Sequence, residues 1–139
     1  MSKTVVVYHH GCLDGHAAKW VARQAFANNP DVEYLPGYYN DKNPLSRDKF
    51  KNAIVYFIDF SYPLEATKIV LDVAQGVIIL DHHKSCYDML QSPELVNYAN
   101  PYTDHVTMDK SGCLIAWEYF FPYVEVPIVT GKQIGRAHV

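Results

Sequence analysis

Histidine and aspartate residues gather in three short segments, each directly after an apolar run. The segments are residues 9–16 (HHGCLDGH), Asp59, and residues 81–83 (DHH). Imidazole and carboxylate together suit manganese, iron or zinc, whereas carboxylate alone suits magnesium or calcium. Several such ligands in one place can hold two ions that share a carboxylate, and such a pair activates water and neutralises a phosphoryl group. The sequence therefore predicts a metal site suited to phosphoryl chemistry.

Each segment also has a purely structural explanation. Asp59 stands before Phe60-Ser61-Tyr62-Pro63 and could simply serve a strand-to-helix turn. The adjacent His82 and His83 fit a surface pair as well as a ligand pair. The joint placement of three segments, all with metal-type ligands, favours a site over these separate explanations.

The apolar runs before these segments predict short buried strands at residues 4–8, 32–35, 53–58 and 77–80, with a weaker strand at 95–98. Helical spacing and first-turn prolines predict helices at residues 14–28, 44–50, 63–74, 84–90 and 111–121. Continuous apolar strands that alternate with helices are typical of a parallel sheet covered on both faces. We therefore expect an α/β fold whose site lies at the carboxyl ends of the strands.

Other conspicuous side chains are expected to be structural. Four large aromatic residues at helical spacing are predicted core residues, namely Trp20, Phe26, Trp117 and Phe120. Cys86 and Cys113 are predicted to be small core residues, and the scattered tyrosines fit structural use better than base stacking. Asp104-His105 and Asp109-Lys110 are assigned to a polar loop, and His16 to solvent.

Composition restricts the class of protein further. The chain has 139 residues, 49% hydrophobic and 19% charged, which fits a single globular domain. A net charge of -3 gives no sign of a basic nucleic-acid surface. Three widely spaced cysteines do not suggest a disulfide framework, and the chain has neither a signal-peptide layout nor an apolar stretch near membrane-spanning length. We expect a cytoplasmic protein with no membrane association and no evident protein partner.

Taken together, the segments resemble the motifs of the DHH phosphoesterase superfamily. Residues 81–84 (DHHK) look like the motif that names it, and residues 8–18 (YHHGCLDGHAA) look like its first motif. Asp59 with the three residues after it is similar to the second motif, and residues 111–113 (SGC) are similar to a Ser-Gly-Ala segment. The similarity covers about residues 4–130. Within the superfamily, the segments look most like a branch that is described as similar to oligoribonucleases and nanoRNases.

The resemblance implies a Rossmann-like DHH domain and a role for each motif residue. Asp59 would bridge two metal ions, preferably manganese, although magnesium or another divalent ion would also serve. His82 would bind one ion and His83 would face the substrate phosphate, so His83 and Asp59 are the predicted catalytic residues. The remaining predicted metal ligands are Asp14, Asp81, and His9 or His10, between which the double histidine leaves the register open.

Two features depart from the superfamily pattern. Cys12 stands where many members carry an acidic residue two positions before Asp14. If Cys12 coordinates as a thiolate, it favours zinc or iron over manganese. If Cys12 is inert, one metal site has one ligand fewer, and His16 could take its place. The family also carries a later acidic ligand, but no Asp or Glu follows Glu125. Residues 1–132 are therefore expected to be an incomplete DHH domain with a poor second metal site, and residues 133–139 (QIGRAHV) a non-native, adaptor-like tail.

The sequence thus predicts a metal-dependent phosphoesterase that cleaves phosphodiester bonds in short oligonucleotides or cyclic nucleotides. Its partner would be a small phosphorylated substrate or a short oligonucleotide. One alternative is an exopolyphosphatase or pyrophosphatase that acts on phosphoanhydrides. Two others are non-catalytic: a nucleotide-binding fold-mate, and a receiver-like domain with Asp59 as phosphate acceptor, which would leave His82 and His83 without a role.

Overall fold

A parallel β-sheet forms the centre of the molecule. The computed structural model describes residues 3–39 and 47–126 and, at residue 47, the backbone only. Within these residues the strands, in chain order, are β1 (Lys3–His9), β2 (Val32–Gly37), β3 (Ala53–Ile58), β4 (Gly76–Asp81) and β5 (Thr103–Val106). They lie in the order β2-β1-β3-β4-β5, and each neighbouring pair is parallel.

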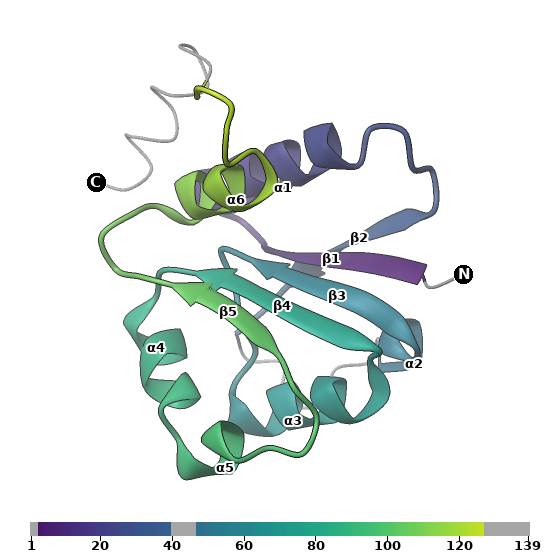
Figure 1. Ribbon diagram of the computed structural model, residues 1–139, viewed down its shortest axis with the longest axis vertical. Coiled ribbons are helices and arrows are strands. Elements are labelled where there is room, and N and C mark those ends of the chain that lie inside the picture. The colour runs from purple at the N-terminus through teal and green to yellow at the C-terminus, as the bar shows by residue number, and fades with distance from the viewer. Residues whose placement is uncertain (1–2, 40–46, 127–139) are drawn as a thin grey trace.

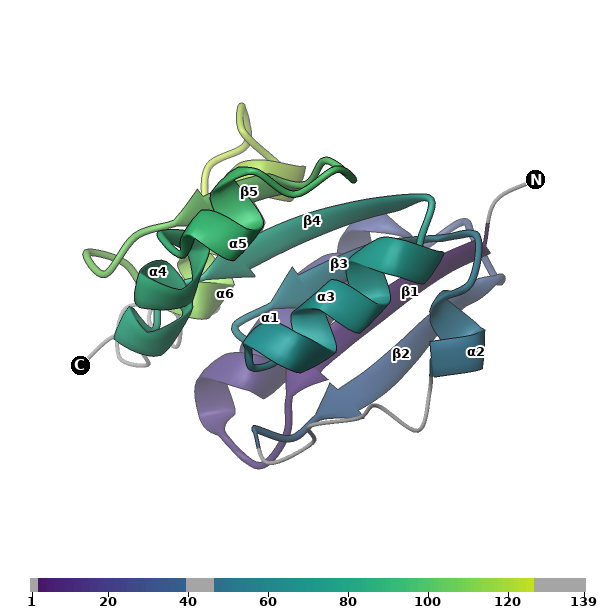
Figure 2. The same ribbon diagram turned by 90° about the horizontal axis from the view of Figure 1, so that it is seen from below.

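Helices cover both faces of this sheet. On one face lie α1 (Leu13–Ala25) and α6 (Gly112–Phe120), and on the other lie α2 (Arg47–Phe50), α3 (Leu64–Val73), α4 (Lys84–Leu90) and α5 (Pro93–Val96) (Figures 1 and 2). This is a Rossmann-like α/β fold, as the alternation of apolar strands with helices predicts. Within the described parts of the chain, no helix is both long and apolar enough to cross a membrane.

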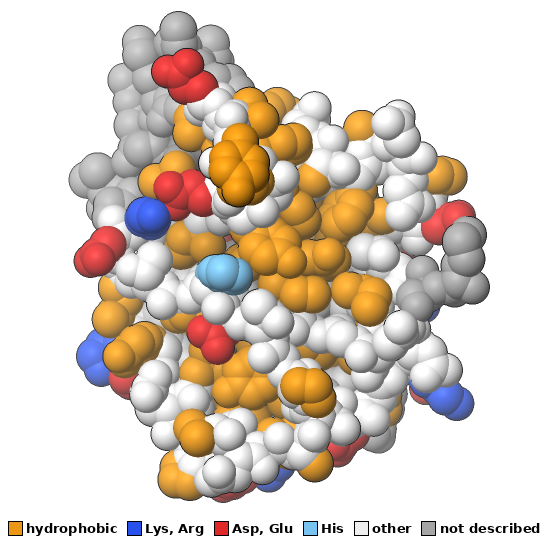
Figure 3. Space-filling view, in the orientation of Figure 1, with side chains coloured by type: hydrophobic (Ala, Val, Ile, Leu, Met, Phe, Trp, Pro, Cys, Tyr) orange, Lys and Arg blue, Asp and Glu red, His pale blue; other side chains and the backbone are white. Residues whose placement is uncertain are grey.

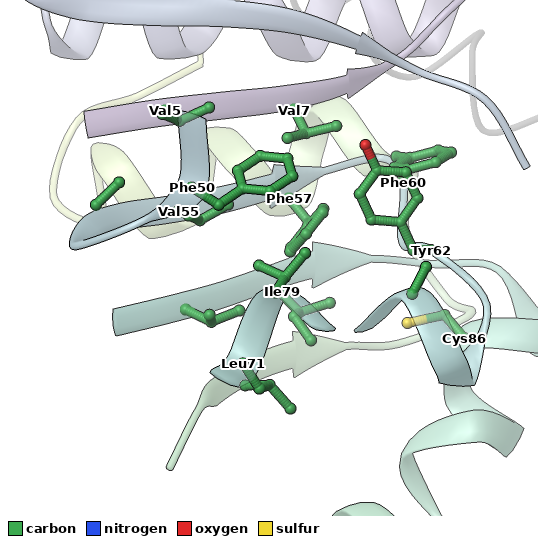
Figure 4. Close-up of a cluster of buried hydrophobic side chains, with 14 of the residues drawn as sticks. Val5, Val7, Phe50, Val55, Phe57, Phe60, Tyr62, Leu71, Ile79 and Cys86 are labelled. Atoms are coloured by element: carbon green, nitrogen blue, oxygen red, sulfur yellow. The ribbon is translucent and has the colours of Figure 1, made fainter. Parts of the chain in front are cut away.

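Two apolar clusters hold the layers together because successive strand residues point to opposite faces. The cluster on the α3 side includes Val5, Val7, Phe57 and Ile79, which converge from β1, β3 and β4 (Figure 4). The cluster under α1 and α6 contains the alternate strand residues Val6, Tyr8, Ile58 and Leu80, together with residues of both helices. Burial on both faces explains why these strands read as continuous apolar runs.

Three predictions of secondary structure are wrong in position or type. Residues 95–98 do not form the expected strand: α5 begins at Pro93, Ser92 Oγ accepts a hydrogen bond from the Glu94 main-chain N–H, and Leu95 is buried. The last strand is β5 instead, where a polar loop containing Asp104 and His105 was expected. Because β5 is a sheet edge with three exposed residues, it has no apolar run to reveal it. Helix α1 also ends at Ala25 rather than at residue 28.

The predicted core residues are mostly confirmed. Cys86, Cys113 and Trp117 are buried, and Phe26 and Phe120 are partly buried against the second cluster. Trp20 is the exception: its side chain is 40% exposed and stacks on Trp117 at the surface. Apolar side chains also gather at the surface below α6, over β3 and β4 (Figure 3). Residues 44–46 of the predicted helix 44–50, the boundary at residue 132 and the tail 133–139 lie outside the described residues.

Candidate metal centre

The three predicted segments meet at one edge of the sheet. Strand β1 ends at His9, β3 is followed directly by Asp59, and β4 ends at Asp81. These strands are neighbours in the order β1-β3-β4 and run in the same direction, so their carboxyl ends lie side by side. Two helices also begin at this edge, since α1 starts after Cys12 and α6 after Ser111.

Asp59 lies at the centre of the site. Its side chain is fully buried, and its backbone has a left-handed φ of 54°. One carboxylate oxygen, Oδ1, lies 2.8 Å from Nε2 of His82. The other, Oδ2, lies 3.4 Å from Sγ of Cys12 and 3.6 Å from Nδ1 of His9. The two oxygens therefore face two different sets of metal-type ligands.

Two groups of side chains have the spacing of a cation site. Asp59, Asp81, His82 and His83 each offer one ligand atom, and these atoms all lie within 4.8 Å of one another. His9, Cys12 and Asp59 meet the same condition. Asp59 belongs to both groups, so the arrangement could hold two cations, one on each side of its carboxylate.

Three buried polar atoms of the site have no hydrogen-bond partner among the described residues. They are Oδ1 of Asp59, Oδ2 of Asp81 and Nε2 of His82. The first and the last of them, Oδ1 of Asp59 and Nε2 of His82, face each other at 2.8 Å in an ion-pair contact. A buried polar atom without a partner costs about 1–3 kcal/mol. Bound divalent cations would satisfy these atoms, so the donor set fits a metal.

The carboxylates give His82 an unusual protonation equilibrium. Its Nε2 lies 3.1 Å from Oδ2 of Asp14 and 2.8 Å from Oδ1 of Asp59. Asp14 first and Asp59 second raise the pKa of His82 to about 10 and outweigh the opposite effect of burial. The two carboxylates thus favour a proton on Nε2 of His82, and coordination of a metal through this atom would have to displace that proton.

Asp14 contacts His82 at the site, but unlike the other predicted ligands it is held by main-chain donors at the start of α6. Its two oxygens accept hydrogen bonds from the main-chain N–H groups of Gly112 and Cys113, at 2.8 and 2.9 Å. Burial alone would raise the pKa of Asp14, but contact with His82 and these main-chain donors hold it well below its usual range. Asp14 stands outside both ligand groups and ties the first turn of α1 to the first turn of α6 beside His82.

The structure separates the two histidines that the sequence left open. His9 belongs to the second ligand group, whereas the exposed His10 packs its ring against Tyr38, with ring centroids 4.9 Å apart. His16 is exposed, as expected, and lies beside Tyr8. Of the two, His9 therefore has the position from which a cation could be bound, and neither His10 nor His16 belongs to a ligand group of the described residues.

His83 is held at the rim of the site by two groups. Its Nδ1 lies 2.8 Å from Oδ1 of Asp81 and 3.0 Å from the hydroxyl of Tyr39. Contact with Asp81 raises the pKa of His83 above its ordinary value. The side chain is 31% exposed, whereas that of Asp81 is buried. His83 is thus the more accessible member of its ligand group and can meet a molecule that arrives from solvent.

Sequence reasoning missed Tyr39 and the role of Gly112. Tyr39 follows β2, a strand that ends in Pro36-Gly37 and carries no His or Asp to draw attention to it. Gly112 lies so close to Asp59 that a Cβ atom there would be 2.3 Å from its Oδ1. The one available signal was the Ser-Gly-Cys segment, which marked the start of α6 but not its contact with Asp59.

A cavity of about 310 Å³ adjoins the site at Tyr39. Its described lining is aromatic, aliphatic and hydroxylic: Tyr39, Ser61, Tyr62, Pro63, Ser85 and Met89. Neither Lys nor Arg is among these described lining residues. The cavity therefore suits an uncharged part of a bound molecule better than a phosphate group.

No protein-family model matches the chain. The chain is similar to Uncharacterized protein R106 of Acanthamoeba polyphaga mimivirus, with 31% identity over 133 residues and 88% of this chain covered. It spans about 30% of the length of that relative. The similarity shows that a related segment occurs within a longer viral protein.

Proposed function

We propose that this chain binds two divalent cations, manganese preferred, and hydrolyses phosphodiester bonds of short oligonucleotides or cyclic nucleotides. The observation that carries the proposal is the position of Asp59, whose two buried oxygens face two separate ligand groups. The motif resemblance supports the same reaction, because it assigns Asp59 the bridging role.

Bound cations would neutralise a phosphoryl group and activate a water molecule beside it. The residues that would hold them are Asp59, Asp81 and His82 on one side, and His9, Cys12 and Asp59 on the other. His83 would contact a phosphoryl oxygen from the rim and hold a proton there. Asp81 would orient His83 through its 2.8 Å contact with Nδ1.

Two features favour a nucleotide over a polyphosphate substrate. The cavity beside Tyr39 has no cationic side chain among its described lining residues, and its aromatic walls can accept a base or sugar. The net charge of -3 gives no sign of an extended basic surface, whereas binding long nucleic acids requires many phosphate contacts. We therefore infer a short nucleotidyl substrate.

The receiver-like alternative is disfavoured by burial. A phosphate acceptor must be reached by its phosphodonor, but Asp59 is fully buried and faces His82. The receiver-like interpretation also gives no role to the two histidines after β4, whereas a metal centre uses both.

The direct test measures hydrolysis by the chain, with added manganese, of a dinucleotide, a cyclic nucleotide, pyrophosphate and polyphosphate. We expect turnover of the phosphodiesters, loss of turnover in excess chelator, and better recovery with manganese than with calcium. Asp59→Asn should remove activity, because it keeps the shape but removes the shared charge. The matched control is Asp31→Asn. Asp31 is an exposed carboxylate directly before β2, at the amino ends of the strands and away from the site. Undiminished turnover in chelator would contradict the proposal.

A further inference from the structure

The second ligand group contains a thiol. Cys12 Sγ lies 3.1 Å from Nδ1 of His9 and 3.4 Å from Oδ2 of Asp59, to which the thiol donates a hydrogen bond. Asp59 is fully buried, and its other oxygen, Oδ1, lies 2.8 Å from Nε2 of His82 in the first ligand group. The sulfur is therefore directed at the same carboxylate that the first ligand group uses.

The backbone around Cys12 favours a coordinating thiolate. Cys12 is the N-cap of α1, and its Sγ accepts a hydrogen bond of 3.2 Å from the main-chain N–H of Gly15. Helix N-termini stabilise thiolates because their free N–H groups and the helix dipole favour negative charge. The sulfur therefore contacts the main-chain donor at the helix end as well as Asp59 and His9, the two residues that would share a cation with it.

The other two cysteines do not share this position. Cys86 and Cys113 are buried, and neither belongs to a ligand group of the described residues. The side chain of Cys113 contacts Ser111 Oγ at 3.4 Å and Asp14, which stands outside both ligand groups. They lie in the same small domain, so they provide matched controls for the sulfur of Cys12.

We propose that the two cation subsites are chemically unequal: the subsite of His9, Cys12 and Asp59 binds a thiophilic ion, zinc or ferrous iron, more tightly than manganese, through the Cys12 thiolate, and holds manganese only when that ion is in excess. The subsite of Asp59, Asp81 and His82 has only nitrogen and oxygen ligands and suits manganese. The S–H bond of Cys12 breaks as the sulfur–metal bond forms, the proton leaves to solvent, and no atom changes oxidation state. This inference rests on the proposed function, because it assumes that this sheet edge binds cations.

Cobalt(II) is the probe, because thiolate ligation gives it a sulfur-to-cobalt charge-transfer band. Titration of the metal-free chain should give two bound cobalt ions and this band. Cys12→Ser should lose the band but retain the ligand-field bands of cobalt, and Cys113→Ala should keep both. Two bound ions without the charge-transfer band, or a band that survives Cys12→Ser, would overturn the thiolate assignment alone. Failure to bind any cobalt would overturn the proposed metal function as well.

A second variant separates ligand chemistry from folding. Cys12→Asp places a hard carboxylate at the same position, where an oxygen ligand can still cap α1. Zinc binds more tightly than manganese at most sites, so the informative quantity is the ratio of the two affinities. We expect the zinc affinity divided by the manganese affinity to fall on the order of 10- to 100-fold in Cys12→Asp. Loss of a group outside the coordination sphere already changes metal affinity this much, and Cys12 would be a direct ligand. An unchanged ratio in a folded, metal-binding Cys12→Asp variant would contradict the inference.

Discussion

His82 and His83 are adjacent in sequence but occupy different environments. His82 is enclosed between Asp14 and Asp59, with Nε2 within 3.1 Å of both carboxylates. His83 is turned toward Asp81 and Tyr39 and is more exposed. One histidine can therefore hold a cation deep in the site while the other meets the substrate.

Replacing these two histidines separately should divide binding from turnover. We expect His82→Ala to weaken manganese binding about 10- to 100-fold or more, because a direct ligand is lost. His83→Ala should lower kcat about 100-fold, with a smaller effect on metal content, because it removes a proton-holding group. Calorimetric titration and steady-state kinetics measure the two effects, with His16→Ala, an exposed residue, as the control. Equal losses of manganese affinity and of kcat in both variants would show that the two histidines do not have separate roles.

Individual residues were predictable to different degrees. Asp59, Asp81, His82 and His83 followed from their places directly after apolar strands, and the structure brings all four together. The choice between His9 and His10 could not be made, because it depends on where β1 stops and on how His10 packs against Tyr38. The contact of Asp14 with α6 joins residues about 100 positions apart, which no local pattern encodes.

At the scale of secondary-structure elements, close approach of α6 to β3 shapes the site. A Cβ atom at Gly112 would lie 2.3 Å from Oδ1 of Asp59 and 2.5 Å from its Cβ. Both the helix start and the strand end are fixed by the main-chain hydrogen bonds around them. Glycine is therefore needed at this position for the helix to sit against the carboxylate.

Gly112→Ala should damage the site, whereas Gly76→Ala should not. The first change overpacks a rigid contact, so we expect a loss of about 1–3 kcal/mol in the free energy of unfolding and weaker metal binding. A Cβ at Gly76 would meet only the flexible end of Ile54 at 3.3 Å, so the change should stay within about 1 kcal/mol. Chemical denaturation of both variants without metal measures the first effect, and metal titration measures the second. Wild-type stability and affinity in Gly112→Ala would refute the packing argument.

The elements themselves were largely predictable where they are buried. Strands β1, β3 and β4 are covered on both faces and appear as uninterrupted apolar runs. Strand β5 has an exposed edge and polar residues, so its sequence resembles a loop. Helix α5 was missed because a single buried leucine after a Ser-Pro start is too short a signal for helical periodicity.

At the scale of the whole molecule, cations should stabilise the fold. Ligands from β1, β3 and β4 and the loops after them would be joined by bound ions, and these ligands are not assembled in the unfolded chain. Binding only to the native state adds about 2.7 kcal/mol at a free metal concentration 100 times the Kd. We expect the Tm to rise with manganese in the wild type and in Asp31→Asn, but much less in Asp59→Asn. An equal rise in all three would place the stabilising ion elsewhere.

The overall charge predicts a preference for short substrates. With a net charge of -3 and no extended basic surface expected, the molecule has little to attract a long polyanion. A dinucleotide should be hydrolysed faster than a long RNA or DNA strand at equal phosphodiester concentration, and raising the salt concentration should change the dinucleotide rate little. Faster processing of long strands would point to an exonuclease of long nucleic acids instead.

We propose that two cations share the carboxylate of Asp59. Electron paramagnetic resonance of the chain loaded with excess manganese tests it most directly, because two ions on one carboxylate are magnetically coupled. We predict a coupled two-manganese spectrum in the wild type and its loss in Asp59→Asn. A wild-type spectrum that contains only isolated manganese ions, at any loading, would contradict the account.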